Sequence, residues 1–355
     1  MRLIEVAVSN EHPMRLDRRT LLTGSLATAG LSANPFSALG QSVDAFTDYT
    51  AAARYSAERS GVSLLVMQGL QTLFEDYPRG GPERFYELAS GTKSFNGIMA
   101  AALVQDGLLT LDEDCADTLT EWRADLPKRT ATIRSLLSLE SGAGGGAIGR
   151  PDTYAGSVAA PFAGPAGTFR YGPAPFQIFG EIVRRKLVAA GLDDDVLGWM
   201  QSRILEPAGV NVGNWRRRDG QPTLPSGAQL TARDWARFGR FVLDGGIIDG
   251  RATLDATALA DNFQPSAANP GYGMSWWLLR PGLIPPAPTS RIDAAPDKLA
   301  RLPDVRMAAG AGNQRLYLVP ERDLLIVRQA DGILRQARGQ GLSWSDADFL
   351  SLLLD

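Results

Sequence analysis

Runs of residues typical of β-strands occur near both ends of the chain. The segments Val62–Met67 and Leu70–Phe74 are separated by Gln68-Gly69, a pattern that predicts a β-hairpin. The same pattern returns late in the chain, where Arg315–Val319 and Leu324–Val327 flank a short turn. The sequence therefore predicts two hairpins that are far apart along the chain.

Segments with helical spacing surround and separate these strands. Apolar residues recur at helical spacing over 43–59, where Asp44 is a predicted N-cap, and over the tail Asp346–Leu354. Further helices are predicted between the two strand-rich ends, over residues 94–106, 132–139, 174–189, 193–205 and 231–244. Prolines are concentrated in residues 281–304, which predicts an irregular surface excursion.

This order of elements predicts the fold class. Strands at both ends with helices between them favour an α/β (α+β) architecture, in which one antiparallel sheet is built from both chain ends and flanked by helices. The predicted sheet lobe comprises residues 41–82 and 265–355, and a mainly helical lobe, residues 83–264, is inserted between them. We expect the active site in the seam between the lobes, where ligand sites commonly form.

Composition excludes several classes of function. The 355 residues are 44% hydrophobic and 21% charged, which is ordinary for a globular protein. Lys and Arg number 36 against 39 Asp and Glu, and no basic stripe is present, so nucleic acid is not an expected partner. His12 and Cys115 are the single residues of their kinds, which excludes a catalytic His triad, a disulfide and the usual zinc sites. We expect neither a metal nor a cofactor.

The first residues have the features of an export signal. Arg18-Arg19 precedes a mildly apolar run, Leu21–Leu31, that is shorter than the ~20 residues needed to span a bilayer. This pattern predicts a twin-arginine-type signal peptide over residues 1–38, which leaves residues 41–355 as the mature domain. The predicted location is periplasmic or secreted, with no stable membrane anchor after cleavage. The alternatives are an amphipathic helix of a cytosolic protein and a start at Met14, which would remove His12.

A nucleophile in this chain must be activated without histidine, and a Ser-Lys pair is the usual alternative. Ser90 and Lys93 stand at the start of the predicted helix 94–106, so Lys93 lies one turn from the Ser90 hydroxyl. Lysine accepts a proton only when neutral, and lowering its pKa from ~10.4 to ~7 costs roughly 4–5 kcal/mol. Burial of Lys93 between two lobes would lower its pKa in this way, because loss of hydration disfavours the charged form. Alternatively, Ser90 is an ordinary N-cap and Lys93 a solvated surface residue.

The residues around this pair resemble a known family. The stretch from Ser90 to Gly142, SGTKSFNGIMAAALVQDGLLTLDEDCADTLTEWRADLPKRTATIRSLLSLESG, resembles the serine β-lactamase-related family in its SxTKxFxG, DGLLxLD and TIRxLLxxxSG patterns. That family includes class C β-lactamases, penicillin-binding carboxypeptidases and esterases. The resemblance covers residues 45–355 and implies a β-lactamase/transpeptidase-like fold. It also implies that Tyr171 shuttles the serine proton, although Pro173 stands where the family usually has asparagine.

The third motif of the family is altered in this chain. The Lys-Thr-Gly or His-x-Gly triplet aligns with Ala308-Ala309-Gly310, so the cationic or imidazole side chain is replaced by Ala308. The resemblance implies that Ala308 and Gly310 lie at the substrate. It also implies that the N–H groups of Ser90 and Ala311 form an oxyanion hole, which needs no side chain. Nylon-oligomer hydrolases and related carboxylesterases have a similar Ala-Ala-Gly-x-x-Gly-Gln pattern. The resemblance therefore points to esters or amides.

Other motifs carry less chemistry. Gly144-x-Gly146-x-x-Gly149 follows a predicted helix rather than a strand, so it predicts a glycine loop and no dinucleotide site. Trp276-Trp277 either lines an acyl pocket or packs in the core. Cys115 is expected to be an inert packed thiol.

Taken with the resemblance, these residues predict an exported serine hydrolase. It would cleave a small-molecule ester or amide through an acyl-Ser90 intermediate, with Lys93 and Tyr171 as general base and proton shuttle. One alternative is a β-lactamase or D-Ala-D-Ala carboxypeptidase, against which the loss of a cation at Ala308 argues. The other is a catalytically silent binding protein on the same scaffold. The sequence does not define the oligomeric state.

The leader yields a direct prediction. Replacing Arg18-Arg19 by Lys-Lys should block export, because the arginine pair is the feature that the twin-arginine pathway reads. The mature N-terminus should fall between about residues 33 and 45. Fractionation of cells followed by N-terminal sequencing checks both points, and wild-type protein that keeps its leader in the cytoplasm would contradict them.

Overall fold

The computed structural model describes residues 49–280, 292, 295–334 and 338–354. The predicted leader over residues 1–38 and the predicted N-cap Asp44 lie outside these residues. In the described part of the chain, no helix is both long enough and apolar enough to cross a membrane.

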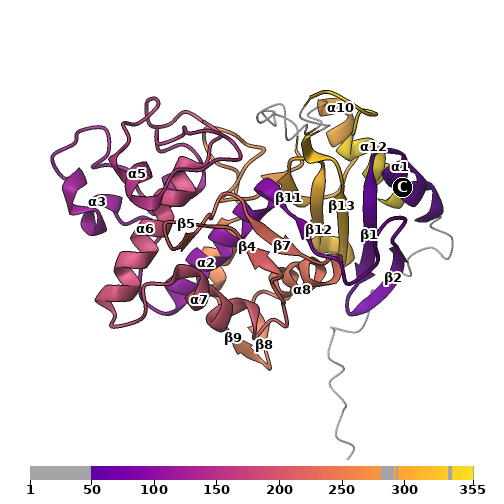
Figure 1. Ribbon diagram of the computed structural model, residues 1–355, viewed down its shortest axis with the longest axis horizontal. Coiled ribbons are helices and arrows are strands. Elements are labelled where there is room, and N and C mark those ends of the chain that lie inside the picture. Colours follow the sequence, from indigo (N-terminus) through magenta and orange to yellow (C-terminus); the bar gives the residue numbers. More distant parts are fainter. Residues whose placement is uncertain (1–48, 281–291, 293–294, 335–337, 355) are drawn as a thin grey trace, which may run out of the picture. The chain divides into compact units, whose positions relative to one another are not determined.

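A six-stranded antiparallel sheet is assembled from both ends of the chain, in the order β10-β11-β12-β13-β1-β2 (Figure 1). The strands are β1 (Gly61–Gln68), β2 (Gln71–Asp76), β10 (Trp277–Leu278), β11 (Arg306–Gly310), β12 (Gln314–Val319) and β13 (Leu324–Ala330). The two predicted hairpins join through the pairing of β1 with β13, where Leu65 lies opposite Val327. This confirms the prediction of one antiparallel sheet built from both chain ends.

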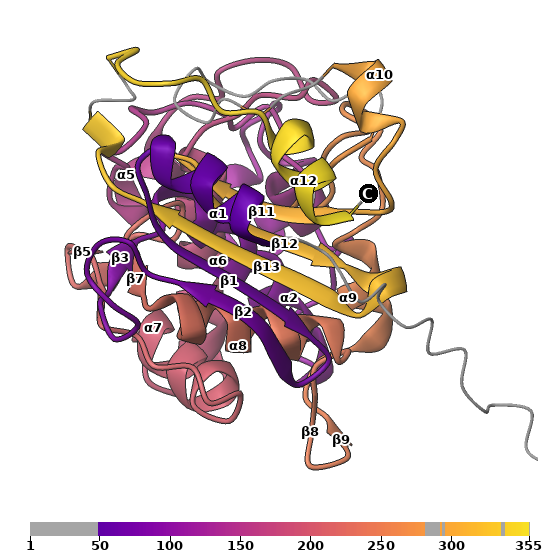
Figure 2. The same ribbon diagram turned by 90° about the vertical axis from the view of Figure 1, so that its right-hand side faces the viewer.

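Helices cover both faces of this sheet. Figure 2 shows α1 (Tyr49–Glu58) and α12 (Asp346–Leu354) in front of the strands and α8 (Ala232–Leu243) behind them. Contacts of α1 with β1 and of α8 with β1, β12 and β13 agree with this arrangement. Because both faces are covered, every residue of β12 and β13 is buried.

Most of the predicted helices form, with some changes at their ends. The remaining α-helices described in this part of the chain are α2 (Ser94–Gln105), α3 (Cys115–Thr118), α4 (Ile133–Leu137), α5 (Tyr154–Ala159), α6 (Ala174–Ala189), α7 (Val196–Met200), α9 (Ala256–Asp261) and α10 (Pro296–Leu299). The predicted helix 193–205 is divided, because α7 continues as a π-helix over Gln201–Leu205. In the predicted irregular segment 281–304, the described residues include the one-turn helix α10.

Short strands that the sequence did not predict complete the fold. A three-stranded sheet has the order β3-β7-β4, and β5 with β6 and β8 with β9 form two small hairpins. Their bounds are β3 (Tyr86–Glu87), β4 (Asn214–Trp215), β5 (Arg217–Arg218), β6 (Gln221–Pro222), β7 (Ala228–Leu230), β8 (Ile247–Ile248) and β9 (Arg251–Ala252). Pairing of β3 with β7 holds the segment just before Ser90 against residues 228–230.

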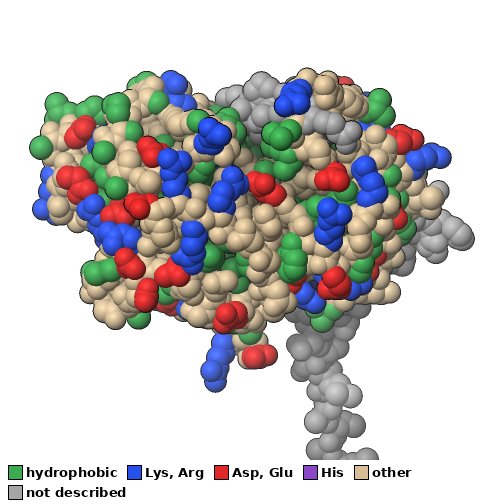
Figure 3. Space-filling model, viewed as in Figure 1, with side chains coloured by type: hydrophobic (Ala, Val, Ile, Leu, Met, Phe, Trp, Pro, Cys, Tyr) green, Lys and Arg blue, Asp and Glu red, His purple; other side chains and the backbone are tan. Residues whose placement is uncertain are grey.

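Helix α2 runs through the interior (Figure 1), and its residues 94–103 are all buried. Gly97 permits this packing, because a Cβ at this position would overlap Asn262 Oδ1. Gly107 follows the helix with a φ of 67°, as expected for a C-terminal glycine cap. On the surface drawn in Figure 3, the described basic and acidic side chains are interspersed.

A buried ion pair connects α12 to the sheet. The Arg315 Nε atom of β12 lies 2.7 Å from Asp346 Oδ1, and both side chains are completely buried. The same oxygen accepts hydrogen bonds from the Tyr317 hydroxyl at 2.6 Å and from Trp344 Nε1 at 3.0 Å. Asp346 therefore neutralises a guanidinium that has no access to water.

Replacing Asp346 by Asn should destabilise the fold by about 3–5 kcal/mol, because it leaves a buried cation without its counter-charge. Asp348→Asn in the same helix is a matched control, since Asp348 pairs with Lys298 on the surface and should cost less than about 1 kcal/mol. Urea unfolding measures both changes. Equal losses for the two variants would contradict this account.

Candidate active site

Ser90 lies in a short turn that leads directly into α2. Residues Ala89–Lys93 form a 3₁₀ helix, η1, and Ala89 has a φ of 47°, which is unusual for a residue with a side chain. The sequence placed Ser90 at the N-terminus of the long helix, whereas the structure places it in this tighter preceding turn. Side chains at i and i+3 eclipse in a 3₁₀ helix, so Ser90 and Lys93 project to the same side.

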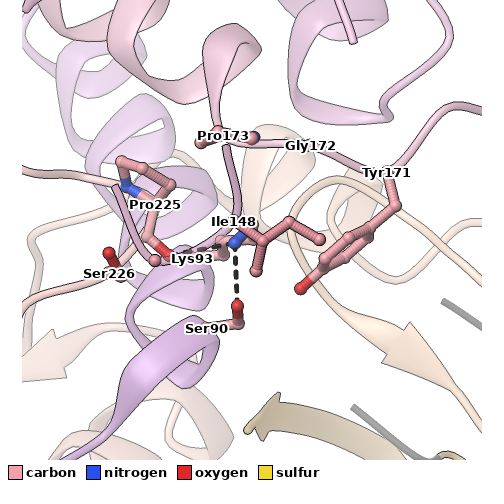
Figure 4. A pocket seen from close by; sticks show the side chains of 9 residues that line it. Ser90, Lys93, Ile148, Tyr171, Gly172, Pro173, Pro225 and Ser226 are labelled. Atoms are coloured by element: carbon pink, nitrogen blue, oxygen red, sulfur yellow. Dashed lines mark hydrogen bonds between the residues drawn. The ribbon is translucent and has the colours of Figure 1, made fainter. Parts of the chain in front are cut away.

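The two side chains of this pair are in contact. The Lys93 Nζ atom lies 3.0 Å from Ser90 Oγ and 3.0 Å from the carbonyl oxygen of Pro225 (Figure 4). Lys93 is only 5% exposed. Among the described residues, no carboxylate lies within ion-pair distance of its ammonium group. The alternative of a solvated surface lysine is therefore wrong.

Burial determines the protonation of Lys93. Loss of hydration disfavours the charged form and lowers the pKa of the Lys93 ammonium from 10.5 to about 7. The rings of Tyr171 and Phe176 lie 4.9 Å and 5.5 Å from Nζ, and their faces partly replace the missing water. Near neutral pH, a large fraction of Lys93 is therefore uncharged and able to accept a proton from a hydroxyl group.

Asn96 fixes the backbone around the lysine. Its Nδ2 atom donates to the carbonyl oxygens of Lys93 at 2.9 Å and Leu224 at 3.0 Å, so it ties α2 to the segment that contains Pro225. The Pro225 carbonyl then holds the Lys93 ammonium next to Ser90. Sequence reasoning missed both contacts, because a carbonyl acceptor leaves no signal in the identity of its residue.

Tyr171 lies at the same pocket, on the side opposite Ser226 (Figure 4). Its ring stacks on Trp277 with centroids 5.7 Å apart, and Tyr272 meets Trp277 edge-on at 4.7 Å. Of the two alternatives for the tryptophan pair, core packing describes Trp276, which stacks on Phe238. Trp277 instead supports the ring of Tyr171.

The pocket around these residues is small. Its volume is about 10 Å³, close to the space that one water molecule needs. Ile148 and Gly149 of the predicted glycine loop line it, together with Pro173 and Ser226. The loop follows α4, as the sequence predicted, and Arg216 donates to the Gly149 carbonyl oxygen at 3.5 Å. The glycine loop therefore covers the Ser-Lys pair.

The third motif lies on β11, next to the turn that holds Ser90. A Cβ at Gly310 would overlap the carbonyl oxygen of Leu88 and lie 3.0 Å from the Gly91 nitrogen, so only glycine fits at this contact. Ala311 follows directly at the end of the strand and is half-buried. Ala308 is completely buried, and neither it nor Gly310 is among the residues that line the pocket. Their predicted role at the substrate stays a prediction, as does the oxyanion hole.

Two buried guanidinium groups orient the turn after β11. Arg315 Nη1 donates to the Gly310 carbonyl oxygen at 3.0 Å. Arg328 Nη1 donates to the carbonyl oxygens of Gly312 at 3.2 Å and Asn313 at 2.8 Å. These contacts fix which way the peptide groups of the turn face.

The described residues contain no group of three or more His, Cys, Asp or Glu side chains that could hold a metal ion. Cys115 is buried, and loss of hydration raises the pKa of its thiol.

A Ser-x-x-Lys pair in contact, next to an antiparallel sheet built from both chain ends, is the arrangement that the sequence resemblance predicted. The Beta-lactamase family matches residues 43–331, and the chain belongs to that family. Members of the family are generally serine hydrolases. No curated protein matches the chain.

Solved structures share the fold at low sequence identity. The class C beta-lactamase from Rhodobacter sphaeroides has a TM-score of 0.60 and 17% identity, with 86% of this chain and 99% of that chain covered. EstCE1, a hydrolase with promiscuous acyltransferase activity, has a TM-score of 0.62 and 13% identity, covering 86% and 96%. A candidate 6-aminohexanoate-dimer hydrolase from Bacillus anthracis has a TM-score of 0.56 and 16% identity, covering 81% and 79%. The expected β-lactamase/transpeptidase-like fold is confirmed.

The pKa of Lys93 predicts how stability depends on pH. Between pH 7 and 10.5 the unfolded chain binds a proton at Lys93 that the folded protein has released, so stability rises with pH in this window. Lys93→Met should therefore be more stable than the wild type near pH 7. As the pH rises from 7 towards 10.5, the difference in free energy of unfolding between the two proteins should shrink by up to about 1.4 kcal/mol per pH unit. Urea unfolding at several pH values measures the difference. A difference that does not change with pH would show that Lys93 keeps its ordinary pKa.

Proposed function

We propose that the protein is a serine hydrolase that cleaves a small ester or amide through an acyl-Ser90 intermediate. The observation that carries this proposal is the contact between Lys93 Nζ and Ser90 Oγ, 3.0 Å apart, together with the burial that lowers the pKa of Lys93 to about 7. A base whose pKa lies near the working pH is well suited to general base catalysis. Export to the periplasm or medium, based on Arg18-Arg19, is part of the proposal.

Acylation begins with neutral Lys93. Its Nζ atom accepts the proton of Ser90 Oγ as this oxygen attacks the substrate carbonyl carbon. The Pro225 carbonyl accepts a hydrogen bond from the same amine and keeps its lone pair directed at Ser90. Negative charge that develops on the carbonyl oxygen is stabilised by the N–H groups of Ser90 and Ala311, in the proposed oxyanion hole.

The leaving group then needs a proton. In the proposed mechanism the Tyr171 hydroxyl delivers it and is reprotonated from the Lys93 ammonium, which returns the lysine to its neutral form. The stack on Trp277 holds the tyrosine ring at the pocket. A water molecule next attacks the acyl carbon and loses a proton to Lys93. Lys93 returns this proton to Ser90 Oγ as the acyl–Oγ bond breaks, which releases the acid and regenerates Ser90.

The preferred substrate is uncharged near the scissile bond. Ala308 supplies no cation at the position where the family's third motif usually has a lysine or histidine, so a substrate carboxylate gains no ion pair there. This favours simple esters and amides over β-lactams and D-Ala-D-Ala peptides. A β-lactamase is the second candidate, because the chain belongs to the family that includes such enzymes.

Labelling with a fluorophosphonate tests the nucleophile, and the label should map to Ser90 and be lost in Ser90→Ala.

Lys93→Arg should lower kcat/KM for an ester by several orders of magnitude, because a guanidinium does not deprotonate at working pH. In the wild type, kcat/KM should rise with pH and level off above an apparent pKa of about 7, as Lys93 becomes neutral.

Three outcomes would contradict the proposal. A label on Ser141 or Ser226 would identify another nucleophile. Nitrocefin turnover faster than ester turnover would favour a β-lactamase. If Ser90 is not labelled and no ester or amide is turned over, the result would favour a binding protein on the same scaffold.

A further inference from the structure

The pocket at Ser90 is too small for a whole substrate. Its volume of about 10 Å³ accommodates little more than one water molecule. The acyl or alcohol part of any substrate must therefore extend beyond it. Pro173 lines this pocket and also lines a second, larger cavity, so the two spaces share a wall.

The second cavity has a volume of about 280 Å³, near the lower end of the range for small-molecule sites. It lies between the glycine loop, the segment that follows α5, and the first turns of α6, and α5 and α6 are in contact. Its walls include Ala143, Phe162, Ala174 and Ile178. Carbon atoms therefore form much of its surface.

The polar groups of the cavity are few. Ser157 contributes a hydroxyl group, and Asp152 is the one charged side chain among the described residues of the wall. Asp152 is exposed, and its Oδ1 atom lies 3.9 Å from Arg218 Nη2. No wall residue carries a positive charge, so an acidic ligand group would lose its hydration without gaining an ion pair.

We propose that this cavity binds an uncharged hydrocarbon group of the substrate while its carbonyl carbon lies at Ser90. The proposal rests on the serine hydrolase function proposed above. Pro173 suits this role, because it presents ring carbons and no N–H donor between the two spaces. Burial of the hydrocarbon group supplies binding energy that holds the ester next to the nucleophile.

Two series of esters test this inference and identify which part of the substrate enters the cavity. In the first, p-nitrophenyl esters vary from acetate to octanoate, so only the acyl chain changes. In the second, alkyl acetates vary in the alcohol chain. In one of the two series, kcat/KM should rise about fourfold with each added methylene until the cavity is filled.

Variants that fill the cavity should remove this dependence. Ala174→Leu, on the wall at the start of α6, should flatten the rise of kcat/KM with chain length. Ala163→Leu, which also lines the cavity and is exposed, provides a second variant if Ala174→Leu does not fold. Ala189→Leu is the matched control, because Ala189 is exposed at the other end of α6 and should leave both series unchanged.

The outcomes separate this inference from the function on which it rests. If the filling variants flatten the rise of kcat/KM with chain length in one of the two series, the inference is supported. That series then shows whether the acyl or the alcohol part of the substrate enters the cavity. Turnover without chain-length dependence, or with a dependence that both filling variants preserve, overturns the inference and leaves the hydrolase function standing. Absence of ester turnover together with absence of label on Ser90 overturns both.

Discussion

The contact between Gly310 and the carbonyl of Leu88 is the constraint on which the site depends. It brings β11 against the 3₁₀ turn of Ser90, at a distance that leaves no room for a side chain. The two segments come from opposite ends of the chain, and pairing of β1 with β13 joins those ends into one sheet. Ser90 and the strand of the third motif are therefore held together by a sheet that joins both ends of the chain.

Burial of Lys93 is the second constraint, and it opposes stability. The lysine has no carboxylate partner among the described residues, so its ammonium is disfavoured and its pKa falls to about 7. Arg315 is also buried, but Asp346 neutralises it, and it keeps its charge. Arg315 is thus a compensated cation with a structural role, whereas Lys93 is an uncompensated amine, to which we assign the role of general base. This contrast is typical of functional sites, where stability is lost in favour of activity.

The sequence predicted those features that repeat or that depend on residue type. Alternation and helical spacing over many residues predicted β1, β2, β12, β13 and α2, and the residue types of Ser90 and Lys93 predicted a reactive pair whose lysine must be desolvated. Strands of two or three residues, such as β3 and β7, carry too little periodicity to be recognised. The Pro225 carbonyl and the covering Ile148 were not predicted, because each depends on chain segments that meet only in the folded protein.

Pro173 connects the two constraints to substrate choice. The family to which the chain belongs usually has an asparagine at this position, which orients the lysine and the substrate amide, and proline supplies no such group. Here the Pro225 carbonyl holds the Lys93 ammonium at 3.0 Å, and Asn96 ties the backbone of Lys93 to the neighbouring Leu224. These contacts hold Lys93 next to Ser90 without a polar side chain at position 173. Pro173 instead contributes ring carbons to the walls of both the small pocket and the 280 Å³ cavity, which supports the proposed preference for uncharged substrates.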